Sequence, residues 1–210
     1  MRNAIDHVSV GAASLAQGAG HLAQTLGVNV PAGSKHPMMA THNHVTRVGD
    51  GIFLELIAVD PDATPTRPRW FGLDDHRIGA LLSERPRPLC WVVRTASLDA
   101  TVAASPIDLG EIVTFRRGDR SWRITVPADG SLPGGGLVPA FIEWSPGPHP
   151  SATHTDLGVR LARVVVSTPD PGRMREWAIA LGTEELASIV EGPTGLGFEF
   201  ATPTGTVFLE

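Results

Sequence analysis

One short pattern occurs three times at nearly equal intervals along the chain: a phenylalanine, an aliphatic residue and a glutamate at the end of an apolar segment. The three copies are Phe53-Leu54-Glu55, Phe141-Ile142-Glu143 and Phe208-Leu209-Glu210. A similar succession of apolar segments and turn residues precedes each copy and begins around His7, Trp91 and Arg163. A sequence with internal repeats is expected to fold into repeated units that bury their apolar faces against one another.

The first repeat predicts a strand, a helix and three further strands. Ile5–Val10 is typical of a buried strand, and Ser14 is a suitable N-cap for a helix that Gly27 ends. After a short extended segment and a Gly/Pro loop, the glycines around Asp50 predict a hairpin, whose second strand is Ile52–Val59. The element order of this repeat is therefore βαβββ.

The same order is predicted twice more. The second repeat has strands at Leu89–Arg94, Glu111–Arg116, Trp122–Val126 and Ala140–Ser145, with a short helix capped by Ser97. The third, shorter repeat has strands at Leu161–Ser167, Ala187–Val190, Gly197–Ala201 and Thr206–Glu210, with a helix through Met174 and Trp177. The sequence thus predicts an α+β fold of three βαβββ modules at 1–60, 89–146 and 159–210, joined by linkers at 61–88 and 147–158.

Composition excludes several classes of partner. Hydrophobic residues make up 42% and charged residues 19% of the chain, a balance typical of a globular core. The net charge is −5 and no long basic run occurs, which argues against nucleic acid and membrane surfaces as partners. The single cysteine, Cys90, cannot form an intrachain disulfide, and Asp6 and His7 interrupt the segment where a signal peptide would be apolar. We therefore expect a cytoplasmic location.

The repeated glutamates need partners. Side chains alternate between the two faces of a strand, so each glutamate shares a face with the phenylalanine of its copy. Burial of an unpaired carboxylate costs several kcal/mol, so that face must supply a cation, a metal ion or strong hydrogen-bond donors. His7 is the best single candidate for a metal ligand, with Glu55 and Glu143 as its partners. The alternatives are a core histidine bonded to the backbone and glutamates paired with arginines, and Glu210 is interpreted as a vestige of the repeat.

Several of these segments together resemble a known superfamily. They are Ile5–Val10, Met39–Asn43, Ile52–Pro61, Phe141–Trp144 and His149-Pro150. The chain looks like a glyoxalase-like domain protein of the vicinal-oxygen-chelate superfamily, of the glyoxalase, bleomycin-resistance and dioxygenase type. The resemblance implies that two βαβββ modules pair, that their mixed sheets curve around an open, barrel-like cleft, and that a divalent metal binds there through the first and last strands of each module.

Carried over to this chain, the family's ligand positions are His7 and Glu55 in the first module, and Trp91 and Glu143 in the second. Three of the four side chains can bind a metal, but the indole nitrogen of Trp91 is only a donor. A set dominated by oxygen would favour Mn, Fe, Zn or Mg over copper. Trp91 would then form a wall of the substrate site, or the site has lost its metal.

Other residues are expected to line the same cleft. His42 or Asn43 corresponds to a cleft-facing segment of the family, and Phe53 and Phe141 add aromatic surface. The histidines at 36, 42 and 44 have a spacing that suits a chelate, but lining of a pocket is the favoured interpretation. The histidines at 149 and 154 lie in a predicted linker and are expected to be solvated.

The resemblance leaves two hypotheses for function. The first is a divalent-metal-dependent enzyme of lyase, isomerase or dioxygenase type that acts on a small organic substrate with vicinal oxygens, with Glu55 or Glu143 as general base. The second is a metal-free protein that binds or sequesters a small molecule in the same cleft, for which Trp91 argues. Because modules of this family pair, the third module is expected to dock on the first two or to pair with a second chain, giving a homodimer.

Overall fold

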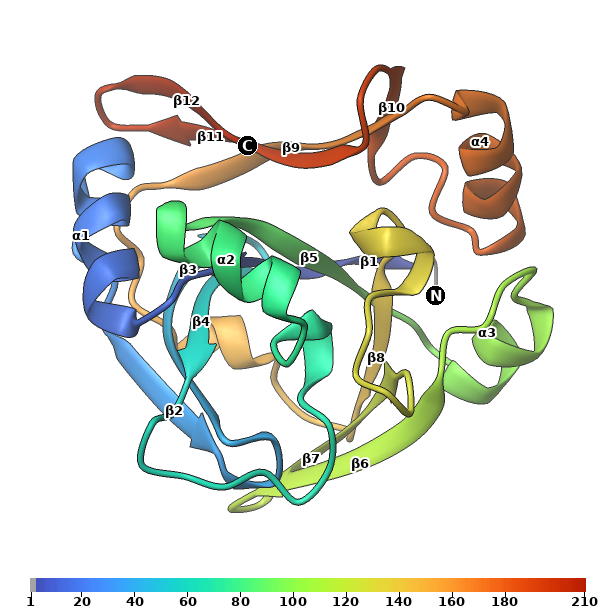
Figure 1. Cartoon of the computed structure of the whole chain (residues 1–210), viewed down its shortest axis with the longest axis horizontal. Coiled ribbons are helices and arrows are strands. Elements are labelled where there is room, and N and C mark those ends of the chain that lie inside the picture. Colours follow the sequence, from blue (N-terminus) through green and yellow to red (C-terminus); the bar gives the residue numbers. More distant parts are fainter. Residues whose placement is uncertain (1–2) are drawn as a thin grey trace.

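Two β-sheets organise the chain in a computed structural model that describes residues 3–210 (Figure 1). The larger sheet has eight strands in the order β2-β3-β4-β1-β5-β8-β7-β6, and the smaller has four in the order β10-β9-β11-β12. The strands of the larger sheet are β1 (Ala4–Gly11), β2 (Ala32–His36), β3 (Thr41–Gly49), β4 (Ile52–Val59), β5 (Arg87–Arg94), β6 (Glu111–Arg117), β7 (Arg120–Val126) and β8 (Ala140–Trp144). Those of the smaller are β9 (Arg160–Thr168), β10 (Ser188–Glu191), β11 (Gly195–Thr202) and β12 (Gly205–Leu209).

The larger sheet consists of two similar halves. In each half the first strand lies parallel to the last, so that β1 pairs with β4 and β5 pairs with β8. The halves join where β1 runs antiparallel to β5, and the sheet curls so that β2 and β6 form its far edges (Figure 1). The predicted α+β fold with a curved mixed sheet is confirmed.

Side-chain caps fix the helices. Helix α1 (Leu15–Leu26) begins where the Ser14 hydroxyl accepts a hydrogen bond from the Gln17 amide, and it ends at Gly27, whose φ of +71° favours glycine. Helix α3 (Leu98–Ala104) starts in the same way at Ser97. Helix α2 (His76–Glu84), capped by the Asp75 carboxylate, lies inside the segment that the sequence suggested was a linker. The short 3-10 turns are Pro37–Met39, Trp70–Gly72, Pro133–Gly136 and Pro150–Thr153.

The third unit has the predicted order of elements but a different pairing. Strand β9 leads through helix α4 (Pro171–Ala180) to β10, which lies parallel beside it, and β11 separates β9 from β12. In the larger sheet the first and last strands of each half are neighbours instead. The expected equivalence of Arg163 with His7, and of Glu210 with Glu55, is therefore wrong: Arg163 pairs with Glu199 on β11.

The smaller sheet covers one face of the larger. Its buried residues Val164, Val166 and Phe198 belong to the same apolar core as Trp91 and Phe141. We call this shared region the outer core. A second apolar cluster, which includes Trp122 and Ile142, lies on the other face of the larger sheet. In the described part of the chain, no helix is long and apolar enough to cross a membrane.

Candidate functional site

A cavity of about 120 Å³ lies on the face of the larger sheet that the smaller sheet does not cover. Strands of both halves line it: His7 on β1, Glu55 on β4, Trp122 on β7 and Ile142 on β8. A single water needs roughly 10 to 15 Å³ of such volume, so a small organic molecule fits. The cavity occupies the cleft that the family resemblance predicts.

A β-bulge places the Asp6 side chain beside that of His7, which lines this cavity. In the pairing of β1 with β5, Ile5 lies opposite Val93 and His7 lies opposite Val92, which leaves Asp6 as an extra residue. A bulge of this kind interrupts the alternation of side chains between faces. As a result the Asp6 carboxylate accepts a hydrogen bond of 2.8 Å from Nδ1 of His7.

Asp6 is fully buried and accepts three hydrogen bonds. Its second oxygen accepts from Nε1 of Trp144 at 2.8 Å and from Nε2 of His149 at 2.9 Å. Burial alone would raise the pKa of Asp6, but the hydrogen bonds from His149 and His7 and the charges of these rings outweigh it and hold the pKa far below its usual range. Asp6 is therefore a carboxylate, and it keeps the Nδ1 proton on His7.

Glu55 is the second buried carboxylate of the site. It is 5% exposed and accepts hydrogen bonds from the Ser9 hydroxyl at 2.8 Å and from the Asn43 amide at 2.7 Å. Burial raises the pKa of Glu55, whereas the nearby His7 and His36 rings and the two hydrogen bonds lower it, and the net direction is downward. Nε2 of His7 lies 3.8 Å from a carboxylate oxygen of Glu55.

The walls of the cavity are largely aromatic. Phe53 stacks on the His7 ring with centroids 4.4 Å apart, which fixes the plane of the imidazole. Trp122 and Trp144 lie 5.2 Å apart on the side of the second half. His36 is also buried in this wall, and burial lowers its pKa to about 4, so its ring is neutral near pH 7.

The structure brings together only some of the residues that the sequence indicated. His7, Glu55, Asn43 and Phe53 all line the cavity. His42 precedes Asn43 on β3 and does not line it.

The residues expected from the second half lie on the opposite face. Trp91 and Phe141 are in the outer core, where Nε1 of Trp91 donates to the carbonyl of Leu137. Glu143 binds the Arg123 guanidinium at 2.9 Å and accepts from the Leu98 amide at the start of α3. The sequence predicts that Glu143 lies close to His7 and Glu55, but in the structure it lies on the other face of the sheet.

Strand register explains this difference. On β4 the cavity side is occupied by Phe53 and Glu55, whereas on β8 it is occupied by Ile142 and Trp144. The repeated Phe-x-Glu motif is thus displaced by one residue relative to the sheet, and a displacement of one residue moves every side chain to the other face. The two motifs have the same residue types in the same order, but their side chains lie on opposite faces of the sheet.

Several residues of the site were not expected from the sequence. Asp6 lies behind His7 through the bulge, His149 binds Asp6, and His154 lines the cavity; both histidines come from the segment interpreted as a solvated linker. Arg117 and Arg120 reach it from the turn between β6 and β7. The Asp-His pair on a buried strand was the one available signal, because a carboxylate beside a histidine often orients its ring.

The donors at the cavity do not form the expected metal site. His7 and Glu55 are the only residues of the expected set that lie close together. Within residues 3–210, no group of three histidine, cysteine, aspartate or glutamate side chains is placed to hold a metal ion. Catalytic zinc sites typically use three protein ligands, so the placed side chains do not fit such a site.

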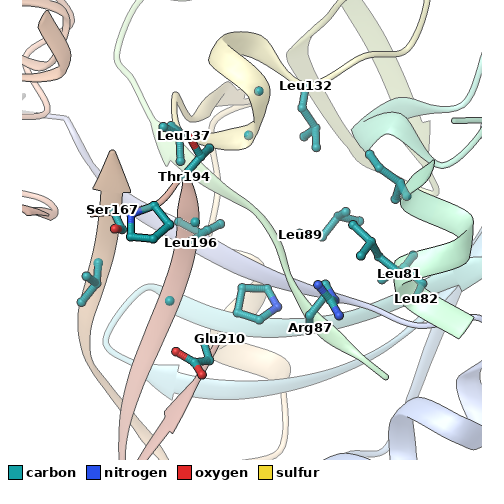
Figure 2. A pocket seen from close by; sticks show the side chains of 18 of the residues that line it. Leu81, Leu82, Arg87, Leu89, Leu132, Leu137, Ser167, Thr194, Leu196 and Glu210 are labelled. Atoms are coloured by element: carbon teal, nitrogen blue, oxygen red, sulfur yellow. The ribbon is translucent and has the colours of Figure 1, made fainter. Parts of the chain in front are cut away.

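A larger cleft of about 500 Å³ separates α2 and β5 from the smaller sheet (Figure 2). Leu81, Leu89 and Leu132 lie on one side of it, and Thr194 and Leu196 lie across from them on the smaller sheet. Unlike the smaller cavity, it has no histidine or buried carboxylate in its described lining. Perturbed titratable groups that share a cavity are the stronger indicator of chemistry, so the smaller cavity is the candidate site.

Comparison with protein families shows to which family the chain belongs. A model described as "Glyoxalase-like domain" matches residues 5–182. The chain belongs to this glyoxalase-like family. It is accordingly a member of the vicinal-oxygen-chelate superfamily.

One solved structure supports the same fold, and a second has a lower score. A hypothetical protein from Staphylococcus aureus has a TM-score of 0.61 at 12% identity, over 99% of this chain and 84% of the other. A methylmalonyl-CoA epimerase from Mycobacterium tuberculosis has a TM-score of 0.44 at 18% identity, over 71% of this chain and 92% of the other. At such identities the similarity concerns the fold alone. No curated protein sequence matches the chain.

Proposed function

We propose that this glyoxalase-like protein is an enzyme of isomerase or lyase type, in which His7 moves a proton on a small organic substrate. One observation carries the proposal: a histidine held by the buried Asp6 carboxylate faces a second buried carboxylate, Glu55, in an aromatic cavity. Groups with this geometry and perturbed pKa values are typical of general acid–base sites.

The arrangement defines a role for each group. Because Nδ1 of His7 donates to Asp6, the lone pair of the neutral ring is on Nε2, on the side of Glu55. Nε2 can accept a proton from a carbon next to a carbonyl group, and Asp6 stabilises the imidazolium that forms. Return of the proton to another atom of the substrate completes an isomerisation, and its transfer to a leaving group completes an elimination.

A metal-dependent form of this function requires more metal ligands than the side chains at the cavity supply. A divalent ion, whether Mn, Fe, Zn or Mg, would polarise substrate oxygens, but His7 and Glu55 offer only two ligands. Metal analysis of the purified protein and of His7→Ala tests this form. Near-stoichiometric metal in the wild type that is lost in His7→Ala would show that the metal-dependent form is the correct one.

Proton transfer can be tested without knowledge of the natural substrate. The protein is incubated in D₂O with a panel of small keto acids and hydroxy acids, and exchange of carbon-bound hydrogen is followed by proton NMR. We expect exchange in the wild type and in His76→Gln, whose side chain is exposed, and loss of at least a hundredfold in His7→Gln. Equal exchange in His7→Gln and wild type would contradict the proposal.

A metal-free binding protein is the second candidate, and the aromatic lining of the cavity favours it. It predicts that small molecules bind in the cavity but none exchanges hydrogen in D₂O. The cytoplasmic location and the homodimer remain predictions from the sequence.

A further inference from the structure

Two arginines at the cavity form no ion pair with a carboxylate of the described residues. Arg117 and Arg120 line it from the ends of the β6–β7 turn. Within residues 3–210, neither takes part in an ion pair, whereas the neighbouring Arg123 binds both Asp99 and Glu143. The Arg117 guanidinium lies 5.4 Å from the centre of the Trp122 ring. A guanidinium can bind a carboxylate through two hydrogen bonds at once, so this part of the lining suits an anion.

Two buried ring nitrogens of the same lining have no hydrogen-bond partner. They are Nε1 of Trp70, a residue that is 4% exposed, and Nδ1 of His154. A buried polar group without a partner is costly, and the exceptions in native proteins need an explanation. The indole N–H is only a donor. Trp70 lines this cavity and also a second one of about 10 Å³, and a ligand oxygen that reached Nε1 would provide the acceptor that it lacks.

The charge distribution gives the ligand a direction. Glu55 is a buried carboxylate in the lining on the His7 side, and its charge disfavours an anionic group there. The cationic side chains belong to the β6–β7 turn, so a carboxylate is favoured at that end. Trp122 and Trp144, whose ring centroids lie 5.2 Å apart, line the cavity beside these arginines and supply aromatic surface for an apolar body.

We propose that the cavity binds a small planar carboxylate that carries a second oxygen. The carboxylate binds Arg117 and Arg120, the planar body lies among the aromatic walls, and the second oxygen accepts from Trp70. This inference rests on the proposed function only for the choice of cavity, because it names the substrate class of the same site and requires no proton transfer.

Three probes of nearly the same shape separate the elements of this proposal. 4-Hydroxybenzoate has both the charge and the second oxygen, 4-hydroxybenzamide lacks the charge, and benzoate lacks the second oxygen. Binding is measured by titration calorimetry at low salt. We expect 4-hydroxybenzoate to bind the wild type roughly tenfold more tightly than 4-hydroxybenzamide, as for a charge-assisted hydrogen bond at a partly exposed site.

The arginine variants test the end that binds the carboxylate. In Arg117→Gln/Arg120→Gln the preference for 4-hydroxybenzoate over 4-hydroxybenzamide should disappear, while 4-hydroxybenzamide binds as before. Arg116→Gln, on the same strand but outside the cavity, should keep the preference. A preference that survives in the double variant, or equal affinity of the wild type for the charged and neutral probes, would overturn the proposal.

A second variant tests the oxygen end and separates this inference from the proposed function. Trp70→Phe should weaken 4-hydroxybenzoate about fivefold and leave benzoate unchanged. Equal weakening of both probes would assign Trp70 a role in packing alone and contradict the second oxygen. His7→Gln should keep the charge preference although it loses hydrogen exchange, so each of the two proposals can fail while the other stands.

Discussion

At the scale of single residues, the cavity depends on carboxylates that are buried and yet ionised. Asp6 and Glu55 escape the usual cost of burial because each accepts hydrogen bonds at both oxygens. The donors to Asp6 come from β1, from the end of β8 and from the segment around His149. This carboxylate therefore joins three parts of the chain and orients His7 at the same time.

Replacement of this carboxylate should cost stability. In Asp6→Asn the negative charge is lost, and at least one of the three donors is left without an acceptor in a dry environment. We expect a loss of about 3 kcal/mol in the free energy of unfolding, measured by urea denaturation. The exposed Asp119→Asn is the control and should change stability by less than about 0.5 kcal/mol. An Asp6→Asn protein as stable as wild type would show that Asp6 does not hold these parts together.

His36 should make stability depend on pH. Its pKa is about 4 in the folded protein and 6.5 when unperturbed, because burial disfavours the charged ring. The unfolded chain therefore binds the proton first, and the stabilising contribution is complete above pH 6.5 and is lost as the pH falls towards 4. The pKa difference corresponds to roughly 3 kcal/mol.

Urea denaturation between pH 7 and pH 4 measures this effect. His36→Gln should show a weaker decline over that range, whereas the exposed His76→Gln should decline like the wild type. Asp6 does not interfere, because its lowered pKa makes its contribution fall only below about pH 4. Parallel curves for His36→Gln and wild type would contradict the assignment.

The sequence predicts the residue types of the site better than it predicts where their side chains lie in the fold. His7, Glu55, Asn43 and Phe53 share a cavity, because one strand pair carries three of them in simple alternation. Asp6 was not expected, because a bulge leaves no mark in the pattern of apolar residues. Glu143 was misplaced because a repeated motif does not reveal the register of the strand that bears it.

At the scale of elements, the packing of α1 on β4 depends on a glycine. A Cβ atom at Gly18 would lie 2.3 Å from the Leu56 side chain and 2.9 Å from Cβ of Ala12. Leu56 is fully buried and has little freedom to move. The close approach of helix and sheet at this point therefore requires the absence of a side chain.

Two glycines of the same helix give a matched pair. Gly18→Ala should destabilise the protein by about 1 to 3 kcal/mol through overpacking. Gly20→Ala should stabilise it by about 0.5 to 1 kcal/mol, because nothing lies within 4 Å of the added Cβ and alanine favours the helix. Thermal unfolding followed by circular dichroism measures both. A shift of the same sign in the two variants would refute this account of the packing.

Most elements followed from local patterns in the sequence. The caps at Ser14 and Ser97 and the glycine at the end of α1 marked two helices correctly. Helix α2 was missed because its segment is rich in proline and arginine and has only one fully buried residue, Leu82. The pairing of β9 with β10 was missed because strand neighbours depend on long-range packing, which a repeat of element order does not determine.

At the scale of the whole molecule, the smaller sheet and the larger sheet share one core. Phe198 and Phe200 of β11 are fully buried in the outer core together with Trp91 and Phe141. The third unit therefore docks on the first two, as one of the two alternatives from the sequence proposed. Neither sheet can lose the other without exposing this apolar surface.

A shared core predicts one cooperative transition. Phe200→Ala should cost about 3 to 5 kcal/mol, and calorimetry should still show a single peak at a lower temperature. Phe208→Ala is the control, because this phenylalanine is 46% exposed and its loss should cost about 1 kcal/mol or less. Two separate peaks in Phe200→Ala would show that the sheets unfold independently.

The bulge at Asp6 makes the site depend on the length of a strand as well as on its residues. If residue 6 is deleted, the register shift between Ile5 and His7 is lost, and Nδ1 of His7 loses the carboxylate to which it donates. The spacing between Ile5 and His7 is therefore a sequence marker: relatives with one residue fewer must support their histidine from another strand or leave it unsupported.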